Sequence, residues 1–214
     1  YLALDFLYVK DIRATTFAIL TVIDMATLFH LAVRSTQAGA AEVFKAFGNL
    51  WLNWAGPPEQ VILDPDPQFL GAFRAQCERL NIDLKYIAAE AHWQLGRKER
   101  HNAAYKECLE KVIDEMQLEG PDDIDLGIVQ MNFAKNTVIH RAGSSPAQAV
   151  MGRQPRVPEG LLSSPENIEM HNLLSEDVRA QRDMAASIRA INAISSYEYE
   201  SHLKRASLRK GAPY

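Results

Sequence analysis

The sequence lacks several features that would identify common classes of protein. No apolar run approaches the roughly 20 residues that a helix needs to cross a bilayer, so we expect no membrane partner. The two cysteines, Cys77 and Cys108, form no Cys-x-x-Cys pair, which argues against a zinc ribbon or a redox motif. Both lie on apolar faces of predicted helices, where buried free thiols are common, so a reducing compartment fits.

The chain also lacks an excess of positive charge. Its formal net charge is -4 over 214 residues, which by itself argues weakly against a nucleic acid partner. The distribution of charge matters more than the sum. Basic residues gather in 95–101 and near the end of the chain, whereas the acidic excess lies in 107–125 and 159–177. The chain begins at Tyr1 without a charged and then apolar leader, so we expect a piece of a longer polypeptide.

The pattern of apolar residues predicts an α/β fold. Apolar runs predict five strands, at 2–9, 16–23, 27–34, 60–63 and 82–88. Helical spacing predicts helices at 40–55, from Phe69 to Leu80, at about 96–118 and near 123–138. The resulting order, βββαβαβαα, predicts a mixed five-stranded sheet with helices on both faces. It is the element order of the ribonuclease H-like fold.

Helix periodicity also predicts which side chains point inward. In the long helix at about 96–118 we expect an inward face of Ala103, Leu109, Val112, Ile113 and Met116.

The composition changes at about Gly152, where prolines and glycines become frequent. We therefore predict a core over 1–153, a linker or extended arm over 154–173, and a helical C-terminal extension with a basic tail over 174–214. The apolar face expected for this last helix consists of Ala180, Met184, Ala185, Ile188, Ile191 and Ile194. The basic tail, which contains Lys204, Arg205, Arg209 and Lys210, is either a solvated surface or a binding site for flanking DNA.

Three carboxylates stand at positions that a soluble surface does not explain. Asp5 interrupts an apolar strand, where an unpaired charge is costly. Asp64 ends a buried strand, where open α/β sheets place their ligand sites, and Glu99 lies near a helix start. In the predicted fold the first strand lies beside the fourth, and the helix after the fifth strand crosses their ends, so these three side chains converge. Divalent cations would relieve their mutual repulsion, and Mg²⁺ prefers oxygen ligands of this kind.

Simpler interpretations exist for each carboxylate. Asp5 could cap a turn, Asp64 could belong to a turn before Pro65, and Glu99 could pair with Lys98 or Arg100. Two other acidic residues are rivals for the site: we interpret Asp24 as a turn residue, and Asp66 lies two residues beyond the strand end.

Several motifs in the right order resemble the catalytic core of retroviral and LTR-retrotransposon integrases. That family carries two aspartates and a glutamate about 35 residues after the second. Here Asp5 lies in LALDFLYV, Asp64 in VILDPDPQF, and Glu99 in HWQLGRKERHN, with 34 residues between Asp64 and Glu99. The segments FAKNTVIH and SSPAQAVMGRQPRVP resemble downstream parts of the family, and the second favours the LTR-retrotransposon branch.

The resemblance implies a function and its residues. A polynucleotidyl transferase would process DNA 3′ ends and join them to target DNA, working as a homo-oligomer in a nucleoprotein complex in the nucleus or cytoplasm. Asp5, Asp64 and Glu99 would be catalytic and would bind two Mg²⁺ or Mn²⁺ ions. Four residues would contact DNA: Gln94, Lys98, Arg100 and Asn102.

The sequence also departs from the family. Asp66 stands where the family usually has glycine, Trp93 replaces a proline, and no His/Cys zinc module is found in this chain. Other interpretations are a ribonuclease H-like nuclease, a cut-and-paste transposase, or a domesticated or inactive DNA-binding or assembly module.

Overall fold

We analysed a computed structural model, which describes residues 1–35, 39–86, 92–138, 143–156 and 178–209, without the side chains of 92–95, 208 and 209. Five strands form one sheet in the order β3-β2-β1-β4-β5. The strands are β1 (Leu2–Lys10), β2 (Thr16–Asp24), β3 (His30–Ser35), β4 (Gln60–Leu63) and β5 (Asp83–Tyr86). The first three are antiparallel, and β4 and β5 run parallel to β1, which confirms the predicted mixed sheet.

The third strand begins three residues later than predicted. The Asp24 carboxylate accepts hydrogen bonds from the backbone N–H groups of Ala26 and Thr27 and from the Thr27 hydroxyl. These bonds hold residues 24–27 in a turn, because a short acidic side chain can satisfy the N–H groups that a turn leaves free. Asp24 is thus the turn residue that the sequence indicated.

The helices follow the predicted order. Helix α1 (Ala40–Phe47) continues through a π-helical turn (Gly48–Leu52) into α2 (Asn53–Ala55), and a 3₁₀ turn (Pro67–Phe69) precedes α3 (Ala72–Arg79). The remaining described helices are α4 (His92–Met116), α5 (Gly120–Thr137), α6 (Pro146–Met151) and α9 (Val178–Arg209). None of the described helices is both long and apolar enough to cross a bilayer.

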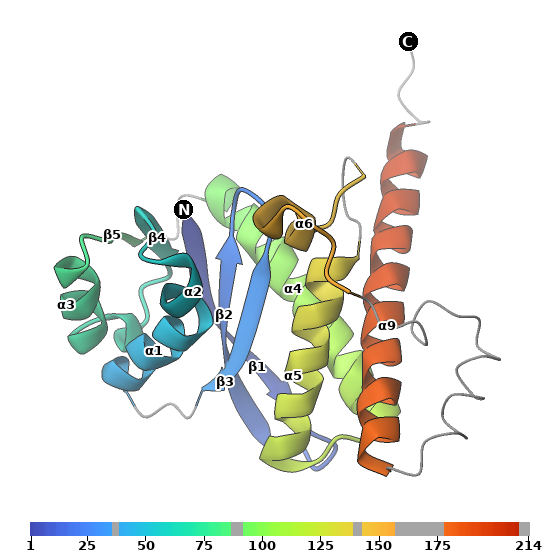
Figure 1. The fold of residues 1–214 in the computed structure, drawn as a ribbon. Helices are drawn as coiled ribbons and strands as arrows, with labels where there is room; N and C mark the ends of the chain where they lie inside the picture. The colour runs from blue at the N-terminus through green and yellow to red at the C-terminus, as the bar shows by residue number, and fades with distance from the viewer. Residues whose placement is uncertain (36–38, 87–91, 139–142, 157–177, 210–214) are drawn as a thin grey trace.

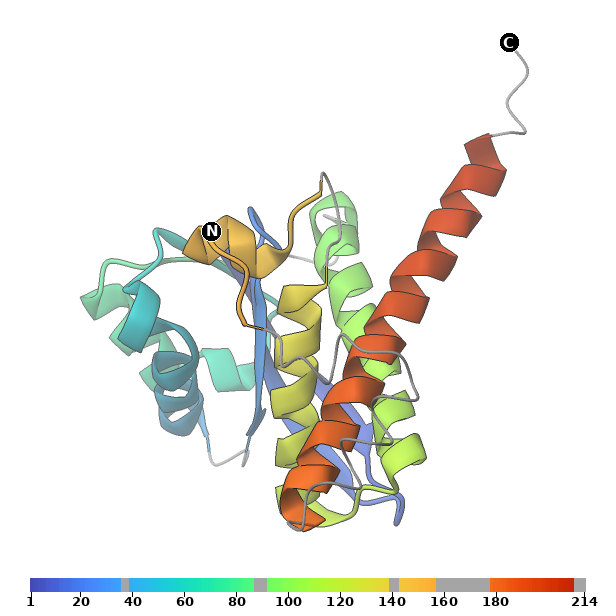
Figure 2. The ribbon, with the colours of Figure 1, turned by 45° about the vertical axis from the view of Figure 1, so that its right-hand side comes forward.

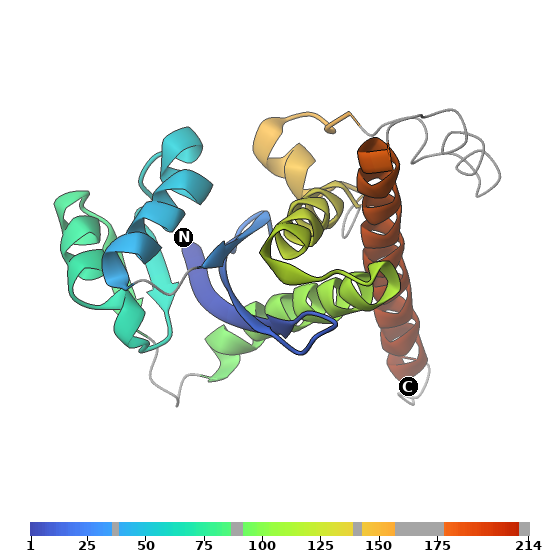
Figure 3. The ribbon, with the colours of Figure 1, turned by 90° about the horizontal axis from the view of Figure 1, so that it is seen from below.

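The sheet separates two groups of helices (Figures 1 and 3), and each group encloses an apolar core against one face. On one face, α1 and α3 pack through Phe47, Phe69 and Phe73. On the other face, α4, α5 and α9 pack through residues such as Tyr105 and Met131. Both cysteines are buried in these cores as free thiols, as predicted. Helices on both faces leave the strand ends as the place where polar side chains from several elements can meet.

Helix α9 packs along α4 and α5, and its C-terminal half projects past the core (Figure 2). Its fully buried apolar residues are Ala186, Ala190, Ala193 and Ile194, so of the predicted face only Ile194 is fully buried, and Ala180 is exposed. The Lys135 ammonium of α5 lies 3.7 Å from the Glu198 carboxylate of α9. This pair, in which the ammonium is buried and the carboxylate is partly exposed, anchors α9 to the core.

The edge strand β3 is held by two asparagines of α5. The Asn136 side chain accepts a hydrogen bond from His30 N and donates one to His30 O, both at 2.8 Å. The Asn132 side chain makes the same pair of bonds with Ala32, at 3.0 and 2.8 Å. Residues four apart lie on one face of a helix, so two amides can replace the neighbouring strand that an edge strand lacks.

Candidate active site

The sheet brings Asp5 and Asp64 to the same level. Strands β1 and β4 run parallel, with Leu2 opposite Val61 and Ala3 opposite Ile62. Two residues further along each chain lie Asp5, within β1, and Asp64, directly after β4. The pairing of the first and fourth strands was predicted, and it explains why two carboxylates far apart in sequence lie close together.

The ammonium group of Lys98 lies between these two carboxylates. The Lys98 ammonium is 2.7 Å from Asp64 Oδ2 and 3.3 Å from Asp5 Oδ2. The Lys98 side chain is only 2% exposed, whereas those of Asp5 and Asp64 are 23% and 41% exposed. A buried ammonium is stable when carboxylates take the place of its lost water, so Lys98 neutralises part of the charge of this pair.

Other polar groups orient Asp5. The Asn102 amide donates to Asp5 Oδ2 at 2.9 Å, and the backbone N–H of Phe6 donates to Asp5 Oδ1 at 2.9 Å. On the neighbouring strand, Thr21 lies opposite Asp5, and its hydroxyl lies 3.2 Å from the Asp5 carbonyl and 3.4 Å from Asn102 Oδ1. Both carboxylate oxygens of Asp5 therefore have donors within the protein.

Glu99 does not join this group. Its side chain is exposed and makes no hydrogen bond or ion pair with any residue that the structure describes. Within the described part of the chain, no three His, Cys, Asp or Glu side chains lie close enough to hold a metal ion. The convergence of three carboxylates that we expected is thus absent from this conformation, and the role of Glu99 stays a prediction.

The reason is the rotational phase of α4. Ala103, which we expected to point inward, is exposed, while Lys98, Asn102 and Tyr105 are buried. One residue corresponds to about 100° around a helix, so an inward Lys98 turns its neighbour Glu99 away from the sheet. Of the other predicted inward residues, Leu109, Val112 and Ile113 are buried, and Met116 is partly buried.

The Asp5 and Asp64 pair nevertheless fits a divalent cation. Oxygens of both carboxylates already lie within 3.3 Å of one positively charged atom, which shows that they can share a cation. Carboxylate oxygens are the ligands that Mg²⁺ prefers. The pair would supply two of the ligands of one ion, provided that the Lys98 ammonium leaves.

The four predicted DNA contacts lie in different environments. Lys98 and Asn102 are buried and bond to the carboxylates rather than facing solvent. Arg100 is exposed and lines a cleft between α4 and α9. The side chain of Gln94 lies outside the described residues.

The sequence did not predict two features of the site. Thr21 looked like an ordinary β-branched strand residue, although its register opposite Asp5 could have been inferred from the hairpin. Asp66 accepts a hydrogen bond from the backbone N–H of Gln68 and so caps the 3₁₀ turn after Asp64. This role explains an acidic residue where the family resemblance suggests glycine.

No protein-family model matches the chain, and no curated protein matches its sequence. Solved structures do match its fold. A chain in the simian T-cell lymphotropic virus intasome in complex with PP2A regulatory subunit B56 gamma matches with a TM-score of 0.60 and 18% identity. That match covers 73% of this chain and 55% of the viral one, so this chain spans little more than half of the viral protein's length.

Two structures of the HTLV-2 integrase catalytic core domain in complex with magnesium match as well. The dimeric and trimeric forms both have a TM-score of 0.56, with 18% and 19% identity. The matches cover 69% of this chain and 91% and 93% of those domains. The chain therefore has the ribonuclease H-like fold of a retroviral integrase catalytic core.

Proposed function

We propose that this chain is the integrase core of an LTR-retrotransposon-type polyprotein. It would catalyse metal-dependent processing of DNA 3′ ends and strand transfer into target DNA. The observation that carries this proposal is the closeness of the Asp5 and Asp64 carboxylates, which share the Lys98 ammonium, on two adjacent parallel strands of an integrase-like sheet. Sheets of this kind bind their ligands at strand ends.

In this mechanism Asp5 and Asp64 would hold one Mg²⁺ or Mn²⁺ ion, and Glu99 with Asp5 would hold a second. Bound ions of this kind activate an attacking oxygen and stabilise the leaving oxygen of a phosphodiester. Asn102 and the backbone N–H of Phe6 keep the Asp5 carboxylate in a fixed orientation. A rotation or partial unwinding of the start of α4 would bring Glu99 inward, since Glu99 lies in the second turn of that helix.

The partners follow from the same reasoning. The solved neighbours include an intasome and dimeric and trimeric integrase cores, which supports DNA as the substrate and a homo-oligomer as the working state. Such a nucleoprotein complex would work in the nucleus or cytoplasm.

The test is a strand-transfer assay on short DNA duplexes with Mg²⁺ or Mn²⁺. We expect joined products with the unaltered chain and none with Asp64→Asn or Glu99→Gln, while circular dichroism shows an unchanged fold. Asp24→Asn is the matched control, because Asp24 lies in a turn and should leave the reaction intact. Full activity of Glu99→Gln would refute the assignment of the third carboxylate. Cleavage without joined products would favour a nuclease.

A second function has one observation in its favour. Because Lys98 lies between Asp5 and Asp64 and Glu99 is exposed, the chain could be a domesticated DNA-binding or assembly module that no longer uses metal. DNA binding without any metal-dependent reaction, in both Mg²⁺ and Mn²⁺, would support this alternative.

A further inference from the structure

Helices α4 and α9 form a cleft that joins two basic segments about 100 residues apart. The helices run antiparallel: Arg189 of α9 lies 3.9 Å from Glu115 of α4, and later residues of α9 lie beside earlier residues of α4. The cleft has a volume of about 450 Å³. Its lining includes Arg100 from α4 and Ser201, Lys204 and Arg205 from α9.

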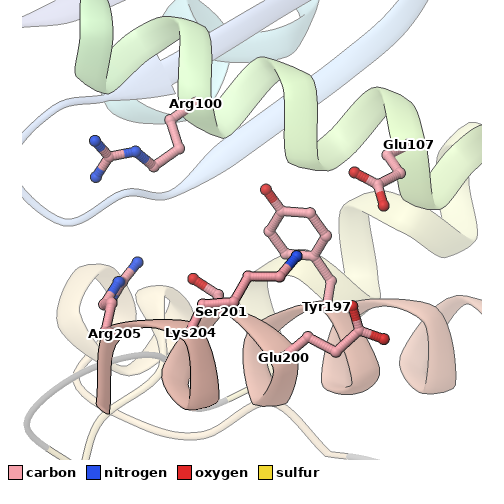
Figure 4. A pocket seen from close by; sticks show the side chains of 7 residues that line it. All are labelled: Arg100, Glu107, Tyr197, Glu200, Ser201, Lys204 and Arg205. Carbon is pink, nitrogen blue, oxygen red and sulfur yellow. The ribbon is translucent and has the colours of Figure 1, made fainter. Parts of the chain in front are cut away.

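The charges in this cleft are unevenly balanced. Arg100, Lys204 and Arg205 form no ion pair with any described residue, although Glu107 and Glu200 also line the cleft. In Figure 4, Arg100 and Arg205 lie at one end of the cleft and Glu107 lies at the other. Cations gathered without acidic partners repel one another, and an anion placed between them relieves this repulsion.

The cleft lies close to the candidate active site along α4. Lys98 faces the carboxylates, and Arg100 is two residues further, about 200° around the helix. The first turns of α4 therefore carry the catalytic site on one side and the basic cleft on the other. DNA bound at Asp5 and Asp64 would extend past this helix end, where α9 projects beyond the core (Figure 2).

We propose that the α4–α9 cleft binds a backbone phosphate of the DNA that flanks the reacting phosphodiester. This inference rests on the proposed function and gives the C-terminal helix a role in it. Arg100 and Arg205 contact the phosphate oxygens, and the Lys204 ammonium and the Ser201 hydroxyl provide further donors. Contacts of this kind position DNA without reading its sequence.

The experiment measures binding of a 30-base-pair duplex by fluorescence anisotropy over a range of KCl concentrations, without divalent ions. Each neutralised phosphate contributes about 0.9 to the slope of log affinity against log salt. For the double variant Lys204→Gln, Arg205→Gln we expect this slope to fall by about 0.9, the value for one phosphate, and binding at 0.1 M salt to weaken by about 10-fold. Glu107→Gln, which removes a negative charge from the cleft, is expected to tighten binding.

The matched control is Lys10→Gln. Lys10 ends β1, and the hairpin that follows contacts Leu118 and Gly120, just after the far end of α4. The Lys10→Gln substitution should leave the slope of log affinity against log salt unchanged. An unchanged slope in the double variant, or an equal loss in Lys10→Gln, would overturn the proposal. The assay needs no catalysis, so a chain that binds DNA through the cleft but joins no ends would refute only the proposed function.

A second inference rests on different observations, namely the burial and contacts of Lys98. We infer that the Lys98 ammonium is a resident counter-ion, which holds Asp5 and Asp64 together and must be displaced before a divalent cation binds. Its two contacts, at 2.7 and 3.3 Å, lie where a shared metal ion would bind the same oxygens. Lys98 would thus lower the affinity of the site for metal.

Calorimetric titration with Mn²⁺ tests this competition. Lys98→Met should bind Mn²⁺ about 10- to 100-fold more tightly than the unaltered chain, the range supplied by one hydrogen bond between charged groups. In EDTA the variant should melt at a lower temperature, and Mn²⁺ should restore it. Lys98→Gln keeps a donor to the carboxylates and provides a second variant if Lys98→Met does not fold.

Lys106→Met is the control, because Lys106 is partly exposed and, within the part of the chain that the structure describes, pairs with Glu110 of its own helix alone, at 3.8 Å. Equal Mn²⁺ affinity in Lys98→Met and the unaltered chain would overturn the inference and leave the proposed function standing. If neither binds Mn²⁺, both the inference and the metal-dependent function are refuted.

Discussion

Replacing Asn136 by alanine should remove about 3 kcal/mol from the free energy of unfolding. The Asn136 side chain is 5% exposed and makes three hydrogen bonds of 2.8 Å, two with the backbone of His30 and one with the carbonyl of Asn132. Truncation leaves the N–H and C=O groups of His30 without these partners in a buried environment. Each buried polar group without a partner costs about 1–3 kcal/mol, so two of them cost about 2–6 kcal/mol, and the expected loss of about 3 kcal/mol lies in the lower half of this range.

This loss is large relative to the whole. Domains are stable by about 5–15 kcal/mol, so about 3 kcal/mol is a substantial fraction. For a chain of this size it corresponds to a fall of about 6–12 °C in the melting temperature. The effect is expected in the free energy of unfolding and not in metal or DNA binding, because Asn136 contacts the edge strand β3 and not the carboxylates.

Urea unfolding followed by circular dichroism measures this quantity. Asn53→Ala is the control, because Asn53 is exposed and, among the described residues, its side chain bonds to Asn49 of the same helical segment alone, so it should change stability by less than about 0.5 kcal/mol. A loss below about 1 kcal/mol for Asn136→Ala would show that water or a shift of β3 satisfies the His30 backbone, and it would refute the role of Asn136 in holding β3.

Three further outcomes are expected. Glu198→Ala should destabilise the chain by about 3 kcal/mol in the same assay, because it leaves the Lys135 ammonium, 1% exposed, without this carboxylate; a change below about 1 kcal/mol would contradict the anchoring of α9. Burial, together with Lys135 and His101, holds the pKa of His30 well below its usual value. The folded chain then does not take up the proton that the unfolded chain binds below about pH 6.5, so the free energy of unfolding should fall as the pH drops through that value. An equal loss of stability over the same pH range in a His30→Phe variant would contradict this. Burial raises the pKa of the Cys77 and Cys108 thiols to about 12, so Ellman's reagent at pH 8 should label them only on unfolding, and rapid labelling of the folded chain would refute their burial.

Much of the fold could be predicted because its signals are local. The apolar runs of β1, β2 and β4 are long enough to identify strands, and the helical spacing before Gly56 identifies α1 to α2. The pairing of the first and fourth strands followed from the element order, and it placed Asp5 near Asp64. Where the apolar pattern is weaker, the observed start of an element differs from the predicted one: β3 starts later and α4 starts earlier than predicted.

The phase of α4 could not be predicted in the same way. Its segment GRKERHN is polar throughout, so no apolar residue there indicates which face turns inward. The packing of Tyr105 and Leu109 further along the helix decides that face, and with it the burial of Lys98 rather than Glu99.

The sequence by itself determined the order of strands and helices, the cores on both faces of the sheet, and the two aspartates within the first strand and after the fourth, because these follow from periodicity and connection rules that act over short stretches. Only the tertiary structure decided that Lys98 lies between those aspartates and that Arg100 shares a cleft with Lys204 and Arg205. Both depend on how helices rotate and dock against surfaces formed by distant parts of the chain, and a shift of one residue in a polar helix changes no local pattern while turning its side chains by about 100°.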